Sequence, residues 1–249
     1  MSLSYQMSHE VAYYECDVNQ TMTVSAMVAV AIQASEKQSN ALGRGVDFVH
    51  QFGLTWIITD YQLFIERLPR VGETIIFKTQ ATSYNRFFCY RNFWLIDQAG
   101  NEIVRIETVF ALMDQTTRKL SRVVEEIIAP YQCEKSTKIK RSPAFSDLES
   151  VEKEYYPIQF FEIDENQHVN NAVYFNWLMS PLGFDFLTTY QPTNLHVRFE
   201  KEVLYGDKVA SCYEVVFLAE KAQTKHEVVV NNQVVCRGEI TWQKKKEVL

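Results

Sequence analysis

The sequence has few of the residues that interrupt packed structure or build specialised scaffolds. Its 249 residues include only 8 Gly and 6 Pro, and 47% are hydrophobic, which excludes collagen and linker-like disorder. The five Cys are odd in number and form no CxxC pair, so we expect neither a disulfide framework nor a zinc ribbon. These absences leave a folded protein of one or two domains with reduced thiols.

Long apolar runs and an excess of basic residues are also missing. No run approaches the roughly 18 residues that a membrane span needs, and residues 1–6 show neither a basic nor an apolar leader segment. The formal net charge of −6 argues against binding nucleic acid by neutralising phosphates. We therefore expect a cytoplasmic protein with no membrane span and no nucleic-acid partner.

An internal repeat organises the chain. The segment Asp17–Met22 (DVNQTM) recurs as Asp164–Val169 (DENQHV), 147 positions later. A helix-like stretch follows each copy, and each half ends in an alternating apolar run rich in β-branched residues, at 103–110 and at 234–242. Each half is therefore predicted to contain a loop, a helix and several strands.

The two expected helices differ in length. Thr21 or Thr23 can cap the first, whose apolar residues recur with helical spacing until glycines end it. Asn170 or Asn171 can cap the second, which Pro181 keeps shorter.

A polar segment without any hydrophobic period separates the repeats. We expect residues 131–155 to be a linker between one half at 1–130 and another at 156–249. One helix on a curved antiparallel sheet, made twice, is an α+β architecture, and the two halves can pair into a longer sheet.

The densest polar constellation is Asp164, Asn166 and His168, whose i, i+2, i+4 spacing puts all three on one face of an extended backbone. They lead into a helix N-terminus, whose free N–H groups can hold an oxyanion, so a hydrolytic site is plausible. The alternative is that the first two shape a turn while His168 is a satisfied boundary histidine. The first copy has Thr21 in place of the histidine.

No second histidine stands at metal-ligand spacing, so no metal site or cofactor is expected.

One longer segment carries a resemblance to a known family. Residues 163–178 read IDENQHVNNAVYFNWL, which resembles the active-site segment of the acyl-acyl carrier protein thioesterases, with the pattern D-x-N-x-H-V-N-N-x-x-Y-x-x-W. Segments 56–59 and 86–94 resemble parts of the family's first half. The resemblance is to the bacterial type of this family, which is similar to the plant enzymes. It implies a tandem hotdog fold, in which an antiparallel sheet wraps around a helix in each half. It also implies hydrolysis of fatty acyl thioesters on acyl carrier protein.

The resemblance assigns four catalytic residues, Asp164, Asn166, His168 and Glu202. Glu200 is the alternative to Glu202. Aligning the halves on their glycine turns sets Glu200 opposite Glu66 and Glu202 opposite Leu68, so only Glu202 is unique to the second half. Plant relatives place a cysteine after this glutamate, whereas this chain has Val203, which rules out a thiolate there.

The chemistry we expect is attack by water on the thioester carbonyl. Glu202 or Asp164 serves as base or orienting anion, while His168 and Asn166 position water and substrate. A covalent anhydride on Asp164 fits the same residues and ranks second. The expected backbone oxyanion donors are Val169, Asn170 and Asn171.

The substrate is expected to lie in the first half and the carrier to dock on basic residues. Candidates for lining an acyl tunnel are Met27, Ala31, Ile32, Trp56 and Tyr61. Because carrier protein is acidic, candidates for its surface are Arg67, Arg70, Lys201, the cluster from Lys135 to Arg141, and Lys244–Lys246. The competing functions are an acyl-coenzyme A thioesterase and a non-catalytic acyl-binding hotdog protein. A homodimer is possible, but no feature of the sequence specifies it.

Overall fold

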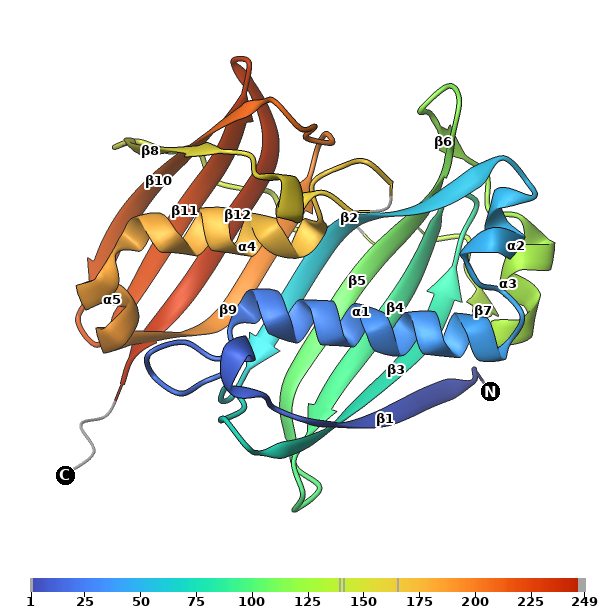
Figure 1. Cartoon of the computed structure of the whole chain (residues 1–249), viewed down its shortest axis with the longest axis horizontal. Coiled ribbons are helices and arrows are strands. Elements are labelled where there is room, and N and C mark those ends of the chain that lie inside the picture. Colours follow the sequence, from blue (N-terminus) through green and yellow to red (C-terminus); the bar gives the residue numbers. More distant parts are fainter. Residues whose placement is uncertain (1, 139, 141, 165, 246–249) are drawn as a thin grey trace.

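The computed structural model describes residues 2–138, 140, 142–164 and 166–245, and is built on one large sheet (Figure 1). Neighbouring strands along its main path are antiparallel. In spatial order they are β1 (Ser4–Glu10), β3 (Thr74–Tyr84), β4 (Phe88–Ile96), β5 (Glu102–Asp114), β2 (Leu54–Ile65), β9 (Tyr190–Phe199), β12 (Gln233–Lys244), β11 (Lys221–Val230), β10 (Lys208–Leu218) and β8 (Glu152–Pro157). Short strands β6 (Leu120–Ser121) and β7 (Glu134–Lys135) pair with β5 and β3.

Two helices, α1 (Val24–Ala41) and α4 (Asn171–Met179), lie on the same face of this sheet (Figure 1). Shorter helices are α2 (Val46–His50), α3 (Glu125–Ile128) and α5 (Phe184–Thr189), with 3-10 turns at Tyr13–Glu15, Ala129–Tyr131, Phe160–Glu162 and Ser180–Leu182. No helix within the described ranges is both long and apolar enough to cross a membrane. The arrangement confirms the predicted α+β tandem hotdog.

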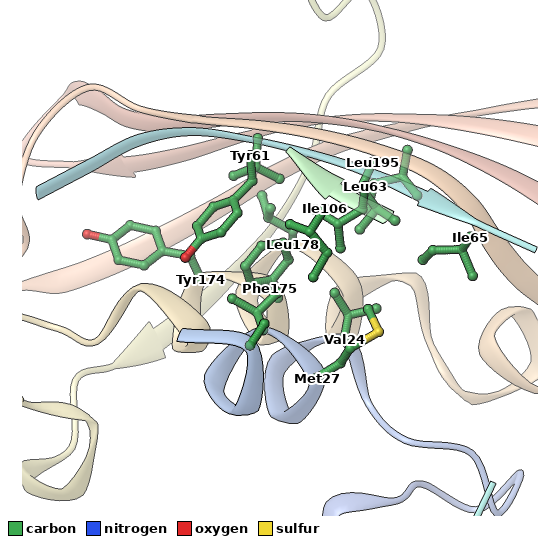
Figure 2. Packing of buried hydrophobic residues seen from close by; sticks show 14 of the residues in the cluster. Val24, Met27, Tyr61, Leu63, Ile65, Ile106, Tyr174, Phe175, Leu178 and Leu195 are labelled. Carbon is green, nitrogen blue, oxygen red and sulfur yellow. The ribbon is translucent and has the colours of Figure 1, made fainter. Parts of the chain in front are cut away.

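The strand order is symmetric about the seam between β2 and β9. Outward from the seam, the first half runs β2, β5, β4, β3, β1, and the second runs β9, β12, β11, β10, β8. At the seam Leu63 stands opposite Leu195, and both are buried. Ile106 lies beside Leu63 on β5, and Phe175 of α4 lies beneath them (Figure 2). The two halves therefore share one continuous sheet and one core, as the paired-sheet prediction required.

Caps fix where the two main helices begin. The Thr23 side chain accepts a hydrogen bond from Ala26 N and starts α1, and the Asn170 side chain accepts one from Ala172 N and starts α4. Helix α4 has nine residues, and a 3-10 turn containing Pro181 follows it. The second half therefore has the shorter of the two central helices, as Pro181 predicted.

The polar segment between the halves crosses the sheet face opposite the helices. Phe145 stacks on His196 with ring centroids 4.3 Å apart, and Arg198 Nη2 donates to the Pro143 carbonyl at 3.2 Å. His196 Nε2 lies 3.1 Å from the buried carboxylate of Asp60 across the seam. The Lys140 N–H also donates to the Tyr90 hydroxyl of the first half at 3.0 Å, so this segment is packed against both halves. Residues 152–155 of the expected linker instead begin β8, which pairs with β10.

A buried histidine in the second half makes stability depend on pH. His226 is fully buried, its Nε2 lies 2.7 Å from Thr224 Oγ1, and its Nδ1 has no partner among the described residues. Burial lowers its pKa to about 3, so the folded protein keeps it neutral while an unfolded chain protonates it below about pH 6.5. Stability should therefore fall, by about 1.4 kcal/mol per pH unit from this group, as pH drops from about 6.5 towards 3.

The test is denaturant unfolding of wild-type protein and His226→Leu across this pH range. Leucine stands at the equivalent position of the first half, Leu95, as the strand pairings on both sides of the seam show. In His226→Leu, the free energy of unfolding should lose the part of its pH dependence that His226 contributes. His50 is exposed, so His50→Gln should keep the wild-type pH dependence. Equal slopes in His226→Leu and wild-type protein would contradict the assignment.

Candidate active site

The loop Asp164–Val169 is a tight turn that leads into α4. Asp164 Oδ1 accepts hydrogen bonds from the backbone N–H of Asn166 at 2.9 Å and of His168 at 3.4 Å, and Gln167 has a φ of 64°. The turn-forming role that the sequence left open for Asp164 is thus present in the structure. It leaves the imidazole of His168 projecting from the end of the turn.

A second segment, residues 199–204, lies against this turn. Val169 N donates to Val203 O at 2.9 Å, just as Met22 N donates to Pro69 O at 2.8 Å in the first half. These matched hydrogen bonds set Val203 opposite Pro69, so Glu202 occupies the place of Leu68 in the repeat. The register deduced from the glycine turns holds, and it brings Glu202 beside the histidine.

His168 and Glu202 form the central contact of the site. His168 Nε2 lies 3.2 Å from Glu202 Oε2, and both side chains are partly exposed. The other carboxylate oxygen accepts from Arg118 Nη2, which comes from the turn between β5 and β6 in the first half. One carboxylate therefore orients an imidazole while a guanidinium orients the carboxylate. Sequence reasoning missed Arg118, and no motif surrounds it.

The three expected oxyanion donors are not equivalent. Val169 N is already bonded to Val203 O, and Asn170 N donates to Glu162 O at 2.9 Å. Neither amide is free, which removes both from the role we expected. Asn171, the first residue of α4, has no backbone acceptor for its N–H among the described residues, and it lies at the positive end of the helix dipole.

Two buried tyrosines lie behind this contact. Burial raises the pKa of Tyr174 and of Tyr61 above the ordinary tyrosine value, so both rings stay neutral phenols. The Tyr61 hydroxyl is buried without a hydrogen-bond partner in the described structure, and its ring meets Phe175 edge-on (Figure 2). The wall behind the site is therefore aromatic.

A single cavity of about 1220 Å³ joins the site to the first half. All four expected catalytic residues line it: Asp164, Asn166, His168 and Glu202. Three of the expected tunnel residues line it too, namely Ile32, Trp56 and Tyr61. The volume suits an extended small-molecule chain.

Met27 and Ala31 do not line this cavity. Both are fully buried on the stripe of α1 that faces the sheet, where Met27 lies beside Val24 beneath the core leucines (Figure 2). The cavity instead runs along the neighbouring face of the helix, past Ala29 and Ile32. Helical periodicity identified the core stripe, and only one edge of that stripe, which includes Ile32, borders the cavity.

The first-half copy of the site is closed. Asn19 Nδ2 donates to Asp17 Oδ2 at 3.1 Å and to the Leu187 carbonyl at 3.3 Å, and Lys245 Nζ donates to the same carbonyl. Thr21 stands in place of His168, with its hydroxyl 3.3 Å from Asp17 Oδ1. This copy therefore has the turn, but it lacks both the imidazole and the carboxylate that pairs with it in the second half.

The basic residues proposed for a carrier surface lie in different places. Lys201 borders the cavity next to the site. Arg67 is paired with Glu73 and Asp97, and Lys135 lies 3.6 Å from Glu125. Arg141 and Lys246, which the sequence also suggested, lie outside the described residues.

Within the described part of the chain, no group of three metal-ligating side chains comes together.

The structure is thus a tandem hotdog with a histidine–glutamate pair beside a cavity that extends into the first half. Two family models match the chain: the acyl-ACP thioesterase N-terminal domain matches residues 2–131 and the C-terminal domain matches residues 145–244. The chain belongs to the acyl-ACP thioesterase family.

Plant relatives match most of the chain at low identity. An acyl-[acyl-carrier-protein] hydrolase of Cuphea viscosissima is 26% identical over 219 residues, covering 80% of this chain and 52% of the relative. An oleoyl-acyl carrier protein thioesterase of Coriandrum sativum is 23% identical over 228 residues, covering 84% and 62%. The chain thus spans between about half and two thirds of the length of these relatives.

Solved structures match over nearly the full chain. A Lactobacillus plantarum protein provisionally named an oleoyl thioesterase superposes with a TM-score of 0.95 and 34% identity, covering 99% of this chain and 98% of that one. A 12:0-ACP thioesterase from Umbellularia californica gives a TM-score of 0.85 at 17% identity, with coverage of 97% and 98%, which shows the fold.

Proposed function

We propose that the protein hydrolyses fatty acyl thioesters carried on acyl carrier protein, releasing free fatty acid. The observation that carries the proposal is the single cavity that contacts His168 and Glu202 and continues along one flank of α1. A thioester held at the pair would extend its chain into this cavity. Family membership and the named activities of the plant relatives support the same reaction.

In the proposed mechanism a water molecule attacks the thioester carbonyl carbon. The His168–Glu202 pair takes a proton from this water as the C–O bond forms. The pair then returns the proton to the leaving sulfur as the C–S bond breaks, which gives a carboxylic acid and a thiol. The free N–H of Asn171 stabilises the oxyanion at the N-terminus of α4. Asp164 keeps one oxygen bound in its turn, which favours a positioning role over the covalent route.

We propose a division of labour between residues 1–130, which hold the acyl chain, and residues 156–249, which cleave it, joined by the linker at 131–155. In the second half, Phe186 of α5 packs edge-on against the buried Trp242, with ring centroids 5.1 Å apart. The wall that the second half contributes to the cavity comes from the site loop, the start of α4, Tyr174 and residues 199–204.

The carrier protein is the proposed partner because Lys201 and Arg118 border the site. Both cations stand where an acidic carrier would deliver its prosthetic arm, despite the overall negative charge. The free cysteines suit a reducing cytoplasm. An acyl-coenzyme A thioesterase is the second candidate, because the same cavity and pair accept either thiol.

The test is release of free fatty acid from matched acyl carrier protein and coenzyme A thioesters of several chain lengths. Faster hydrolysis of the carrier-protein set would support the proposal and give the preferred chain length. Faster hydrolysis of the coenzyme A set would favour the second candidate. Binding of acyl chains without hydrolysis of either set would make the protein a non-catalytic acyl binder.

The cavity wall at Ile32 is expected to control chain length. Ile32 is half-buried on the flank of α1 that faces the cavity, so Ile32→Phe narrows the path without entering the main core. The variant should lose about 10-fold in kcat/KM on the longest substrates and less on short ones. Ile32→Val is the matched control and should shift the preference the other way. An unchanged chain-length profile in both variants would place the acyl chain elsewhere.

A further inference from the structure

The cavity wall beside the last turns of α1, away from the catalytic pair, contains a buried cation. Ser25 Oγ donates to the Ala172 carbonyl at 2.8 Å, which ties the first turn of α1 to the start of α4 at the catalytic end. The cavity then follows α1 from Val28 to Ser39, roughly 16 Å along the helix axis. Arg91 of β4 lines it beside the last turns of α1 and is only 7% exposed.

Neutral groups hold this guanidinium in place. Arg91 Nη1 donates to Gln38 Oε1 at 2.6 Å and to Thr79 Oγ1 at 2.9 Å, and its Cζ lies 5.3 Å from the ring centre of Tyr131. The Tyr131 hydroxyl donates to Ser39 Oγ at 2.8 Å. The cation is therefore fixed at a defined point of the cavity wall.

No carboxylate neutralises Arg91 within the described part of the chain. The groups close enough to influence its pKa are Tyr131, Cys133 and Cys89, and burial has the largest effect, lowering that pKa. A guanidinium starts so high that it stays charged even when buried. An unpaired buried charge costs free energy unless an acceptor comes to it.

The fold itself does not require a cation at this position. Counting outward from the Leu63–Leu195 seam, the strand pairings set Ala222 in the second half opposite Arg91 in the first. Ala222 is fully buried in an apolar environment. The same hotdog frame is therefore built once with a small apolar residue and once with an arginine facing the cavity.

We propose that this end of the cavity binds an oxygen substituent at the distal end of the acyl chain, a carboxylate in the strongest case, through the guanidinium of Arg91. A carboxylate would neutralise the buried charge and accept hydrogen bonds from the guanidinium, whereas a hydroxyl would accept a hydrogen bond only. A plain methyl terminus would leave the cation without an acceptor. The proposal rests on the proposed function and names the substrate class within it.

Binding is tested with fatty amides, whose amide replaces the thioester and cannot be mistaken for a distal carboxylate. Amides of one chain length ending in a methyl, a hydroxyl or a carboxylate are titrated calorimetrically into the full-length protein. We expect Kd for the carboxylate-ended amide to be at least about 10-fold lower than for the methyl-ended one, with the hydroxyl-ended one between them. Equal Kd values, or tightest binding of the methyl-ended amide, would overturn the proposal.

Variants assign the preference to the guanidinium. Arg91→Gln should abolish the difference between the three amides, Arg91→Lys should retain part of it, and Arg105→Gln on the opposite face of the neighbouring strand should keep it whole. Circular dichroism and thermal unfolding check that each variant is folded. If Arg91→Gln does not fold, Arg91→Lys decides, because a preference among the amides equal to that of wild-type protein would show that the guanidinium does not cause it.

Hydrolysis of the corresponding thioesters separates this proposal from the proposed function. Hydrolysis without any preference for the oxygenated chains would reject the distal site and leave the thioesterase intact. A preference in amide binding without hydrolysis of any thioester would support the distal site and reject the thioesterase.

Discussion

Glu202→Gln is expected to lower kcat/KM for acyl thioesters by about 1000-fold while the protein stays folded. The substitution keeps the size of the side chain and its ability to hydrogen-bond, but removes the negative charge that faces His168 Nε2 at 3.2 Å. A neutral amide cannot stabilise the positive charge that the imidazole acquires when it takes a proton from water. The loss should therefore appear mainly in kcat.

The measurement is steady-state hydrolysis of the best substrate, beside thermal unfolding of each variant. Glu200→Gln is the matched comparison, because Glu200 precedes the catalytic candidate by two residues, also borders the cavity and is likewise exposed. A large loss confined to Glu202→Gln supports the assignment. If Glu200→Gln alone loses activity, the alternative glutamate carries the chemistry.

The contiguous part of the site could be predicted from sequence because its geometry is local. Asp164, Asn166 and His168 lie on one turn, and the helix cap that follows is encoded within the next residues. Glu202 is distant in sequence, but comparison of the two repeats separated it from Glu200 because only one of them replaces an apolar residue of the first half. Internal duplication thus supplied information that spacing alone did not contain.

Other parts of the site depend on contacts that no local pattern records. Arg118 reaches Glu202 from a turn in the other half, 84 residues earlier, with a left-handed backbone conformation that is uncommon for arginine. The amides of Val169 and Asn170 resembled free helix-terminal donors, but pairing with residues 203 and 162 occupies them. Long-range partners decide which polar groups remain available.

The fold followed from periodicity more completely than the cavity did. Apolar spacing located α1, and alternation located β5 and β12, because burial of one face imposes those periods. The same spacing misplaced Met27 and Ala31 in the tunnel. A helix that packs on a sheet presents its most apolar stripe to the core, and a cavity beside it is lined by a mixed stripe that hydrophobicity does not mark.

His168→Ala is expected to lower kcat by at least about 100-fold with little change in stability, because the imidazole is partly exposed and packs little. Thr21→Ala is the matched control, since Thr21 occupies the same place in the closed copy of the first half. It should leave hydrolysis close to the wild-type rate. An undiminished rate in His168→Ala would remove the imidazole from the mechanism.

The double variant His168→Ala/Glu202→Gln distinguishes a working pair from two independent groups. If Glu202 acts by orienting His168 and stabilising its positive charge, the double variant should lose little more kcat/KM than the weaker of the two single variants. Once one member of the pair is replaced, the other has no partner through which to act. Independent roles predict that the two losses multiply, to about 100,000-fold. Measuring kcat/KM for both single variants and the double variant on one substrate decides between a general-base pair and a carboxylate that activates water on its own.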